Sequence, residues 1–466
     1  MQRRDRLRRS DRPGPPAGLA AFRSGPHGTL SGTVKDAATG KPVAHATVGS
    51  GPDIATTDTH GAYTLDLPAG TVEDLTVKAF GYTTTAPVTL DIADGQALTR
   101  DFGLSAIPRE RVHGTVEDGS GHGWPLYARL TVSGSPEAPV WTDPVTGAYD
   151  MALPKGSDYT LNVTAALPGY EPLARKVMVH NKTVTEDVAL TADPDTATAV
   201  GYRLELADRT ETFDSTAAAP QGWSVLNAAG TGNGWEFDDP TQRGNSTGGD
   251  GAFAVVESDN GPIGPHQDSQ LISPEYDLSA AQSAELTFKT AYLYNPNQQH
   301  MTVDASTDSG ATWENVWTGP KISDSAQRLT EHVPLRQFAG HKTVRLRFHF
   351  VADWGYFWSL DDVDVQTRVL VPTPGGLIVG TVRDARSRAG VVGATVGDTA
   401  DPDETALTTA TPEDPAVGDG FYTLFSADPG PHTLRVTASG YAELTRRTTV
   451  HRDRVTRRNL RLRPDA

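Results

Sequence analysis

The chain has 466 residues, 37% of them hydrophobic, with 46 glycines and 33 prolines, so we expect three or four turn-rich domains with few long helices. Its formal charge of -17 disfavours a nucleic-acid partner. The absence of cysteine excludes disulfides, a thiol nucleophile and any Cys-ligated metal.

The first segment, 1–27, begins with MQRRDRLRRS and carries the positive charge of a secretion signal. It lacks the apolar region of about 7 to 15 residues that such a signal needs, so we expect a disordered leader. No stretch approaches the roughly 20 apolar residues that span a bilayer, and we therefore expect no membrane insertion.

Three segments repeat one pattern, at 28–106, 109–193 and 375–466. Each contains Gly-Thr-Val in an alternating strand, then Gly-x-Tyr after a turn, and closes on Gly-Tyr. The motif residues are Gly32, Gly114 and Gly380 in the first element, Tyr63, Tyr149 and Tyr422 in the second, and Tyr82, Tyr170 and Tyr441 at the close. We expect these tyrosines to pack in cores and corners rather than to form a sugar platform.

These motifs resemble the carboxypeptidase regulatory-like family, whose fold is a seven-stranded, transthyretin-like β-sandwich. The resemblance implies three small sandwiches with the boundaries given above. The connections near Pro108, Asp193 to Thr198 and Pro372 to Gly376 are short, so we expect modest flexibility between domains.

The segment 198–368 differs in character, since it holds six of the eight tryptophans. Its alternation and turn spacing predict about eight to ten antiparallel strands, consistent with a jelly roll. The order of elements resembles the MAM-like jelly-roll domains of secreted bacterial peptidases of the bacillopeptidase F type and of cleaved adhesins. The matching positions are Trp223, Trp235, the segment 248–254, Glu257 to Asp259, and Trp358 with Asp361 and Asp362. The whole chain is thus predicted to be all-β.

Jelly rolls of this kind can hold a structural Ca²⁺ between the first and last strands, using carboxylate and main-chain oxygens. Asp214 in the opening strand and Asp361 or Asp362 in the closing strand would meet if the sandwich closes in this way. Glu257 and Asp259 are weaker candidates, because the resemblance favours Asp where Glu257 stands. Ordinary turn caps and exposed acids are the alternative interpretation.

The segment 306–313, Ser-Thr-Asp-Ser-Gly-Ala-Thr-Trp, matches an Asp-box, a hairpin in which Asp308 bonds turn amides and Trp313 packs beneath. A sialidase propeller would repeat this hairpin through several blades, whereas here it occurs once. We interpret it as structural.

Catalytic motifs are scarce. The segment 244–248 fits G-x-S-x-G, but a nucleophile elbow needs a strand before it and a helix after it, and no helix is expected there. The sequence contains no G-T-S-M-A segment, no H-E-x-x-H and no phosphate-cradling G-x-x-x-x-G-K-[ST].

The leading hypothesis is a monomeric, non-catalytic accessory or adhesion protein, extracellular or at the cell surface. In it the sandwiches act as spacers and the jelly roll binds a polysaccharide, cell-envelope or protein ligand. The chain resembles the non-catalytic C-terminal region of a secreted subtilisin-like serine peptidase. One alternative is a hydrolase with its site in the jelly roll around Trp223, Trp235, Trp354 and Trp358. Another is a structural stalk stabilised by calcium.

Overall fold

The computed structural model describes residues 25–196, 199–214, 218–229, 234–258, 266–296, 298–322 and 326–465. These residues form β-strands and one 3₁₀ helix, η2 (Arg336–Phe338), and include no α-helix, so the all-β prediction is confirmed. No helix within the described ranges is long and apolar enough to cross a membrane.

The chain divides into two compact units. One comprises Met1–Val116, Tyr127–Thr164 and Pro172–Val188, and the other comprises Glu117–Leu126, Ala165–Glu171 and Ala189–Ala466. Two segments of the second sandwich, Glu117–Leu126 and Ala165–Glu171, therefore belong to the same unit as the residues from Ala189 onward.

The first sandwich packs two four-stranded sheets, in the orders β4-β1-β7, with β8 also pairing β1, and β3-β2-β5-β6. Its core is aliphatic and includes Leu30, Val34 and Leu75, which are 1%, 0% and 0% exposed. The strands are β1 (His27–Asp36), β2 (Thr47–Ser50), β3 (Asp53–Thr56), β4 (Ala62–Pro68), β5 (Gly70–Lys78), β6 (Val88–Ile92), β7 (Ala97–Thr99) and β8 (Phe102–Leu104).

The second and third sandwiches repeat this pairing order strand for strand. The second consists of β9 (Arg109–Asp118), β10 (Ala128–Val132), β11 (Val140–Trp141), β12 (Ala148–Pro154), β13 (Ser157–Ala165), β14 (Leu173–Val179), β15 (Val184–Thr185) and β16 (Val188–Leu190). The third consists of β27 (Gly376–Asp384), β28 (Thr395–Asp398), β29 (Thr405–Leu407), β30 (Phe421–Ser426), β31 (Gly430–Thr437), β32 (Leu444–Val450), β33 (Val455–Arg457) and β34 (Leu460–Leu462).

The Gly-Thr-Val glycine is required by a close backbone approach in all three sandwiches. A Cβ atom at Gly32, Gly114 or Gly380 would lie 1.8, 1.9 or 2.0 Å from the carbonyl oxygen of Arg100, Glu186 or Arg458. The motif tyrosine then donates its hydroxyl to that same carbonyl, over 2.8 Å from Tyr63, 2.7 Å from Tyr149 and 2.7 Å from Tyr422. These tyrosines are 4%, 4% and 1% exposed, so their predicted core position is confirmed.

Residues 202–372 form a larger central sandwich of two five-stranded sheets, ordered β17-β26-β21-β24, with β19 pairing β26, and β18-β20-β25-β22-β23. Its ten strands pair antiparallel, in agreement with the predicted number. They are β17 (Tyr202–Glu211), β18 (Ser224–Asn227), β19 (Ala254–Glu257), β20 (Gln267–Ile272), β21 (Ser283–Leu293), β22 (Gln299–Ser306), β23 (Glu314–Thr318), β24 (Gln327–Pro334), β25 (Arg345–Ala352) and β26 (Phe357–Pro372).

Aromatic rings fill the space between the two sheets. Trp358 is fully buried, its Nε1 donates to Thr290 Oγ1 over 2.8 Å, and its ring centroid lies 5.2 Å from Trp235 and 5.7 Å from Trp317. Such pairs add about 0.5–1.5 kcal/mol beyond the area they bury, so this cluster stabilises the sheet packing.

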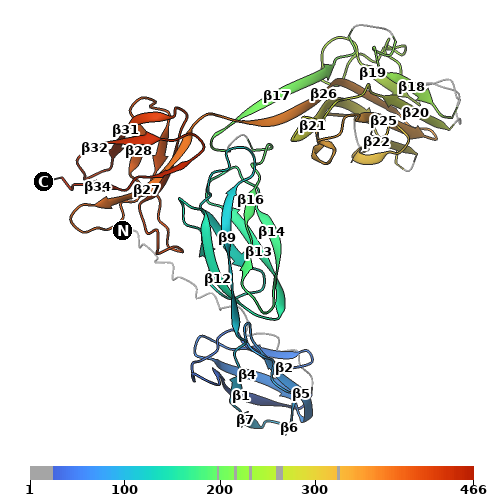
Figure 1. Cartoon of the computed structure of the whole chain (residues 1–466). Helices are drawn as coiled ribbons and strands as arrows, with labels where there is room; N and C mark the ends of the chain where they lie inside the picture. Colours follow the sequence, from blue (N-terminus) through green and yellow to red (C-terminus); the bar gives the residue numbers. More distant parts are fainter. Residues whose placement is uncertain are drawn as a thin grey trace, which may run out of the picture. The chain divides into compact units, whose positions relative to one another are not determined.

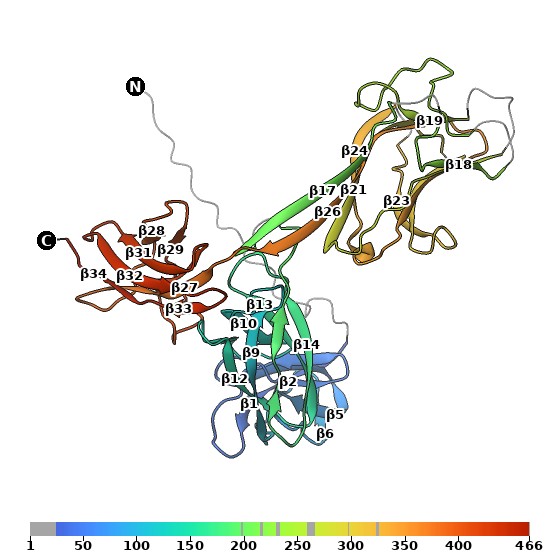
Figure 2. The same cartoon turned by 45° about the horizontal axis from the view of Figure 1, so that its top comes forward.

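The ribbon of β17 and β26 extends from the central sandwich, as Figures 1 and 2 show. Tyr202 pairs with Pro372 at its end. The closing strand therefore runs four residues beyond the boundary expected at 368, because Val369, Leu370 and Val371 continue the strand after polar residues that resemble an end.

We expect Gly32→Ala to destabilise the first sandwich by roughly 1–3 kcal/mol, because an added methyl group forces the backbones apart. The control is Gly103→Ala, where the nearest heavy atom to the new methyl group is Ala37 Cβ at 3.5 Å. That change should stay within about 0.5 kcal/mol. Hydrogen exchange of amides in 28–106 measures both, and equal effects would contradict the steric explanation.

Candidate functional site

Two of the candidate calcium residues of the central sandwich, Asp214 and Asp361, meet around one glycine-rich loop. A Cβ atom at Gly249 would lie 2.0 Å from Asp361 Oδ2, and one at Gly251 would lie 1.8 Å from Asp214 Oδ1. Asp214 Oδ1 accepts the Ala252 amide over 2.9 Å. The loop therefore passes directly over both carboxylates.

Asp361 lies at the centre of this acidic cluster and is fully buried. Its Oδ2 accepts Asn245 Nδ2 over 2.7 Å and Thr247 Oγ1 over 3.4 Å, and its Oδ1 accepts the Asp362 amide over 2.7 Å. Burial raises the pKa of Asp361, and the charges of Asp362 and Asp214 raise it further, while the Asn245 bond opposes the rise. Positive charge beside Asp361 would relieve this.

Lys289 supplies one positive charge, with its Nζ 2.6 Å from Asp362 Oδ2. This hydrogen bond raises the pKa of Lys289, and the charges of Asp362, Asp361 and Asp250 add to the rise. Within the described ranges no three His, Asp or Glu side chains are arranged to hold a metal ion. Any cation bound here must therefore take several ligands from the main chain, from neutral side chains or from water.

Glu257 is not part of this cluster. It pairs with Phe357 across β19 and β26, four residues along the strand from Asp361, or about 13 Å at a strand's rise per residue. Its buried carboxylate is bonded by Thr241 Oγ1 over 2.7 Å and by Arg243. Asp259, the other weak candidate, lies outside the described residues.

The four tryptophans of the hydrolase hypothesis do not surround an open site. Trp223, Trp235 and Trp358 are 7%, 4% and 0% exposed within the central core, and only Trp354 reaches the surface. The segment 244–248 lacks the strand and helix of a nucleophile elbow. The hydrolase hypothesis was therefore wrong about its site, because three of these four rings fill the core.

An exposed aromatic loop lies at 353–356, between β25 and β26. Trp354 is 51% exposed and Tyr356 is 38% exposed. The loop backbone is fixed by three side chains: Asn295 Nδ2 donates to the Trp354 carbonyl over 2.5 Å, Gln299 Oε1 accepts the Tyr356 amide over 2.9 Å, and Ser258 Oγ accepts the Gly355 amide over 3.1 Å. The sequence analysis missed Tyr356, although the Trp-Gly-Tyr turn between two strands was a signal for it.

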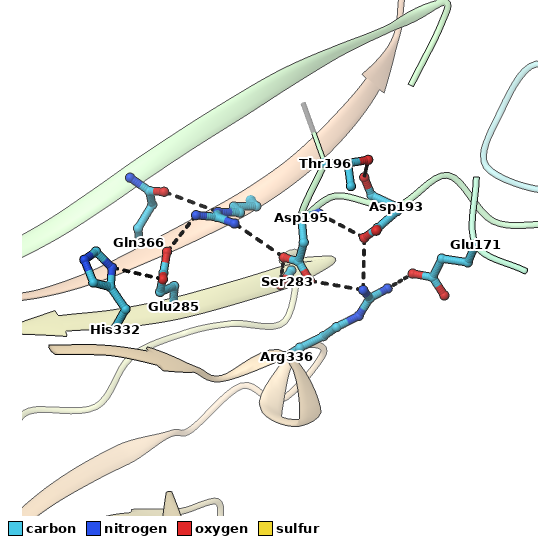
Figure 3. Close-up of polar contacts among 10 residues, drawn as sticks. Glu171, Asp193, Asp195, Thr196, Ser283, Glu285, His332, Arg336 and Gln366 are labelled. Atoms are coloured by element: carbon cyan, nitrogen blue, oxygen red, sulfur yellow. Dashed lines mark hydrogen bonds and ion pairs between the residues drawn. The ribbon is translucent and has the colours of Figure 1, made fainter. Parts of the chain in front are cut away.

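An ion-pair network at the base of the central sandwich holds the connection that precedes it (Figure 3). Arg336, in η2, pairs with Glu171, and its Nη1 lies 3.1 Å from both Asp193 Oδ1 and Asp195 Oδ2. Ser283 Oγ also donates to Asp195 over 2.6 Å.

The network continues through Arg368, whose Nη1 lies 3.5 Å from Asp195 Oδ1 and whose Nη2 lies 2.7 Å from Glu285 Oε2. The described part of the connection predicted to be modestly flexible is thus held by several charged contacts. Sequence did not show this, because Arg336 and Asp195 are 141 positions apart.

The Asp-box hairpin forms as predicted. Asp308 Oδ1 accepts the Thr312 amide over 2.9 Å, and Asp308 Oδ2 accepts the Thr312 hydroxyl over 2.6 Å. The guanidinium of Arg347 lies 4.5 Å from the ring centroid of Trp313. These contacts stabilise the turn itself, which agrees with a structural role.

Comparison with known families matches residues 29–105 and 378–463 to the Carboxypeptidase regulatory-like domain. The predicted resemblance is therefore confirmed for the first and third sandwiches. The second has the same pairing order and the same glycine and tyrosine contacts. A search of curated proteins found no match.

Several solved structures are similar in part. They include the K3 cleaved adhesin domain of Lys-gingipain from Porphyromonas gingivalis W83, with 22% identity over 34% of this chain and 100% of that chain, and a TM-score of 0.28. The streptococcal ancillary pilin gives 17% identity over 36% and 63%, with a TM-score of 0.22. The shaft pilin SpaA of Lactobacillus rhamnosus GG gives 12% over 36% and 98%, with a TM-score of 0.21. TM-scores this low support no functional conclusion.

We expect Asp308→Ala to lower the stability of the central sandwich at neutral pH but not in strong acid. The Thr312 hydroxyl, followed by its amide, lowers the pKa of Asp308 from 3.8 to about 2. A carboxylate with a depressed folded-state pKa stabilises above its unfolded pKa, and this contribution is lost as pH falls from about 4 to about 2. Urea midpoints across that window measure it. A difference from the native chain that stays constant down to pH 2 would contradict the prediction.

Proposed function

We propose that this protein is a non-catalytic accessory or adhesion protein acting outside the cell. In this proposal the small sandwiches space the chain, and the central sandwich, a MAM-like jelly roll, presents the binding surface. Two observations support it: the match of two sandwiches to the Carboxypeptidase regulatory-like domain, and the exposed aromatic loop 353–356. The ligand class that best fits this loop is carbohydrate.

The observation that carries the proposal is the exposure of Trp354 on an anchored loop. Burying an aromatic ring is favourable, and Trp235 and Trp317 of the same sandwich both pack against Trp358. Asn295 and Gln299 bond the loop backbone, so the backbone needs little ordering on binding. An exposed aromatic face on an anchored loop suits the apolar face of a sugar ring.

A partnership with a secreted serine peptidase is the finer part of this proposal. It is supported by the resemblance of the domain order to the non-catalytic region of such enzymes. An in-frame sequence encoding an Asp/His/Ser catalytic domain beside this chain would be the expected finding.

We expect Trp354→Ala to weaken binding to a glycan-array or cell-envelope ligand about tenfold or more, with unchanged unfolding, because a central aromatic contact is lost. Leu206→Ala is the matched control, since Leu206 is also 51% exposed and lies on β17. Binding of the full chain is measured by array and titration. The idea fails if no glycan, envelope fraction or protein ligand binds, or if both variants weaken binding equally.

We also propose that the acidic cluster binds a structural Ca²⁺. The support is a buried carboxylate, Asp361, whose pKa is raised beside Asp214 and Asp362, with Lys289 nearby as a compensating cation. Asp214 and Asp361 would hold the ion with main-chain oxygens of the loop 249–251, since Ca²⁺ accepts six to eight oxygen ligands. Bound calcium would neutralise charge and join the opening and closing strands.

We expect calcium to raise the melting temperature of the central sandwich by about 5–10 °C over chelator, since saturation at 100 times Kd stabilises by about 2.7 kcal/mol. Asp361→Asn should abolish this increment. Asp364→Asn on the same strand, whose carboxylate accepts Thr210 Oγ1 over 2.8 Å, should retain it. Calorimetry that records no calcium increment in the native chain would rule the site out.

A further inference from the structure

The third sandwich carries a surface hollow of about 420 Å³ that is rich in arginine. Its lining residues are Thr381, Arg383, Arg446, Asn459, Leu460 and Arg461. They come from β27, β32 and β34, with Asn459 directly before β34. Arg383 and Arg461 are paired positions on adjacent parallel strands, so the sheet register itself sets two guanidinium groups side by side.

These arginines are not matched by carboxylates. Arg383 Nη2 donates to the Val417 carbonyl over 3.2 Å, and Arg446 Nη1 donates to the Thr445 carbonyl over 3.2 Å. Neither they nor Arg461 form an ion pair with any residue in the described part of the chain, whereas Arg435 of the same sandwich pairs with Glu443 over 2.8 Å. Like charges placed together without a counter-charge repel one another, so a bound anion would lower the electrostatic energy of this hollow.

The second sandwich supplies an internal comparison, because equivalent positions follow from shared contacts. Thr115 donates its amide to Asp187 over 2.8 Å, as Thr381 donates its amide to Asn459 over 3.0 Å. Glu186 and Arg458 each offer the carbonyl that accepts the motif tyrosine. Arg175 pairs with Leu161 as Arg446 pairs with Leu434.

At these positions the second sandwich is acidic and the third is basic. The second has Glu117, Arg175, Glu186, Asp187 and Ala189, and its Arg175 is bonded to Glu186 over 2.5 Å. The third has Arg383, Arg446, Arg458, Asn459 and Arg461. Where the second sandwich has one arginine and three carboxylates, the third has four arginines and no carboxylate, in a chain whose total charge is -17.

A buried donor adds to this pattern. Arg458 Nε is inaccessible and has no hydrogen-bond partner among the described residues. A buried N–H without an acceptor is costly, so this donor, next to Asn459 of the hollow, needs an explanation.

We propose that this arginine hollow binds an oxyanion, phosphate or carboxylate, carried on an acidic polysaccharide. Guanidinium groups match both oxyanions with paired hydrogen bonds, and the hollow offers three of them with an amide and a hydroxyl. No aromatic ring lines it, so unpaired nucleic-acid bases would find no stacking surface, and its contacts suit a polymer held through its anionic groups. The proposal goes beyond the proposed function, in which this sandwich only spaces the chain.

The test titrates the full chain with a phosphomannan, polygalacturonate, inorganic phosphate and an oligodeoxythymidylate. We expect at least one acidic polymer to bind, with affinity falling as salt rises. Preference for the first polymer identifies phosphate as the ligand group, and preference for the second identifies carboxylate. Tighter binding of the oligonucleotide, or binding of inorganic phosphate but of neither polymer, would overturn the proposal.

Variants locate the site. Arg446→Gln should weaken polymer binding about tenfold, the loss expected for a charge-assisted contact. Arg447→Gln removes the same charge from the neighbouring position of β32, which does not line the hollow, and should change affinity less than twofold. Equal losses in the two variants would show general charge attraction and refute the site.

A second variant protects the test against misfolding. Arg383→Glu with Arg461→Ala installs the residues that the second sandwich carries at these positions, where the same strand pairing already forms. We expect it to fold and to lose polymer binding more than tenfold, and retained binding would overturn the proposal. This double variant should keep the neutral-glycan affinity that Trp354→Ala removes, which separates the outcome from that of the proposed function.

Discussion

A close contact between two strands governs the small sandwiches. In each, a strand glycine lets a carbonyl of the returning chain approach to where a Cβ atom would otherwise stand, and a buried tyrosine hydroxyl then bonds that carbonyl. The contact sets the parallel pairing of the last strands against the first. In the third sandwich this same register places Arg383 beside Arg461, so a rule of folding also builds the proposed anion site.

The central sandwich follows another constraint, since its two sheets are held apart by aromatic rings. Trp223, Trp235 and Trp358 fill that space, so their rings are not available at the surface. Trp354 stays exposed because it lies in the turn between β25 and β26, where side chains anchor the backbone and leave the ring uncovered. The division between packing and binding thus follows from position along a strand.

Charge is distributed unevenly over this acidic chain. Around Arg336 and Arg368 carboxylates and guanidinium groups balance and hold a connection in place. Around Asp361 acid exceeds base, and in the arginine hollow base exceeds acid. Balanced groups stabilise local structure, whereas each imbalance favours a bound ion of opposite sign.

The sequence by itself determined the β class, the three repeats and their buried tyrosines, because strand alternation and turn glycines are local signals. Through a resemblance, it also predicted that Asp214 lies close to Asp361 or Asp362. It kept Glu257 as a weaker candidate at the same site, and it could not show that three tryptophans are buried while a fourth is exposed, or that Arg383, Arg446 and Arg461 share one hollow. Only the tertiary structure decided these matters, because they depend on strand register and on contacts between residues far apart in the chain.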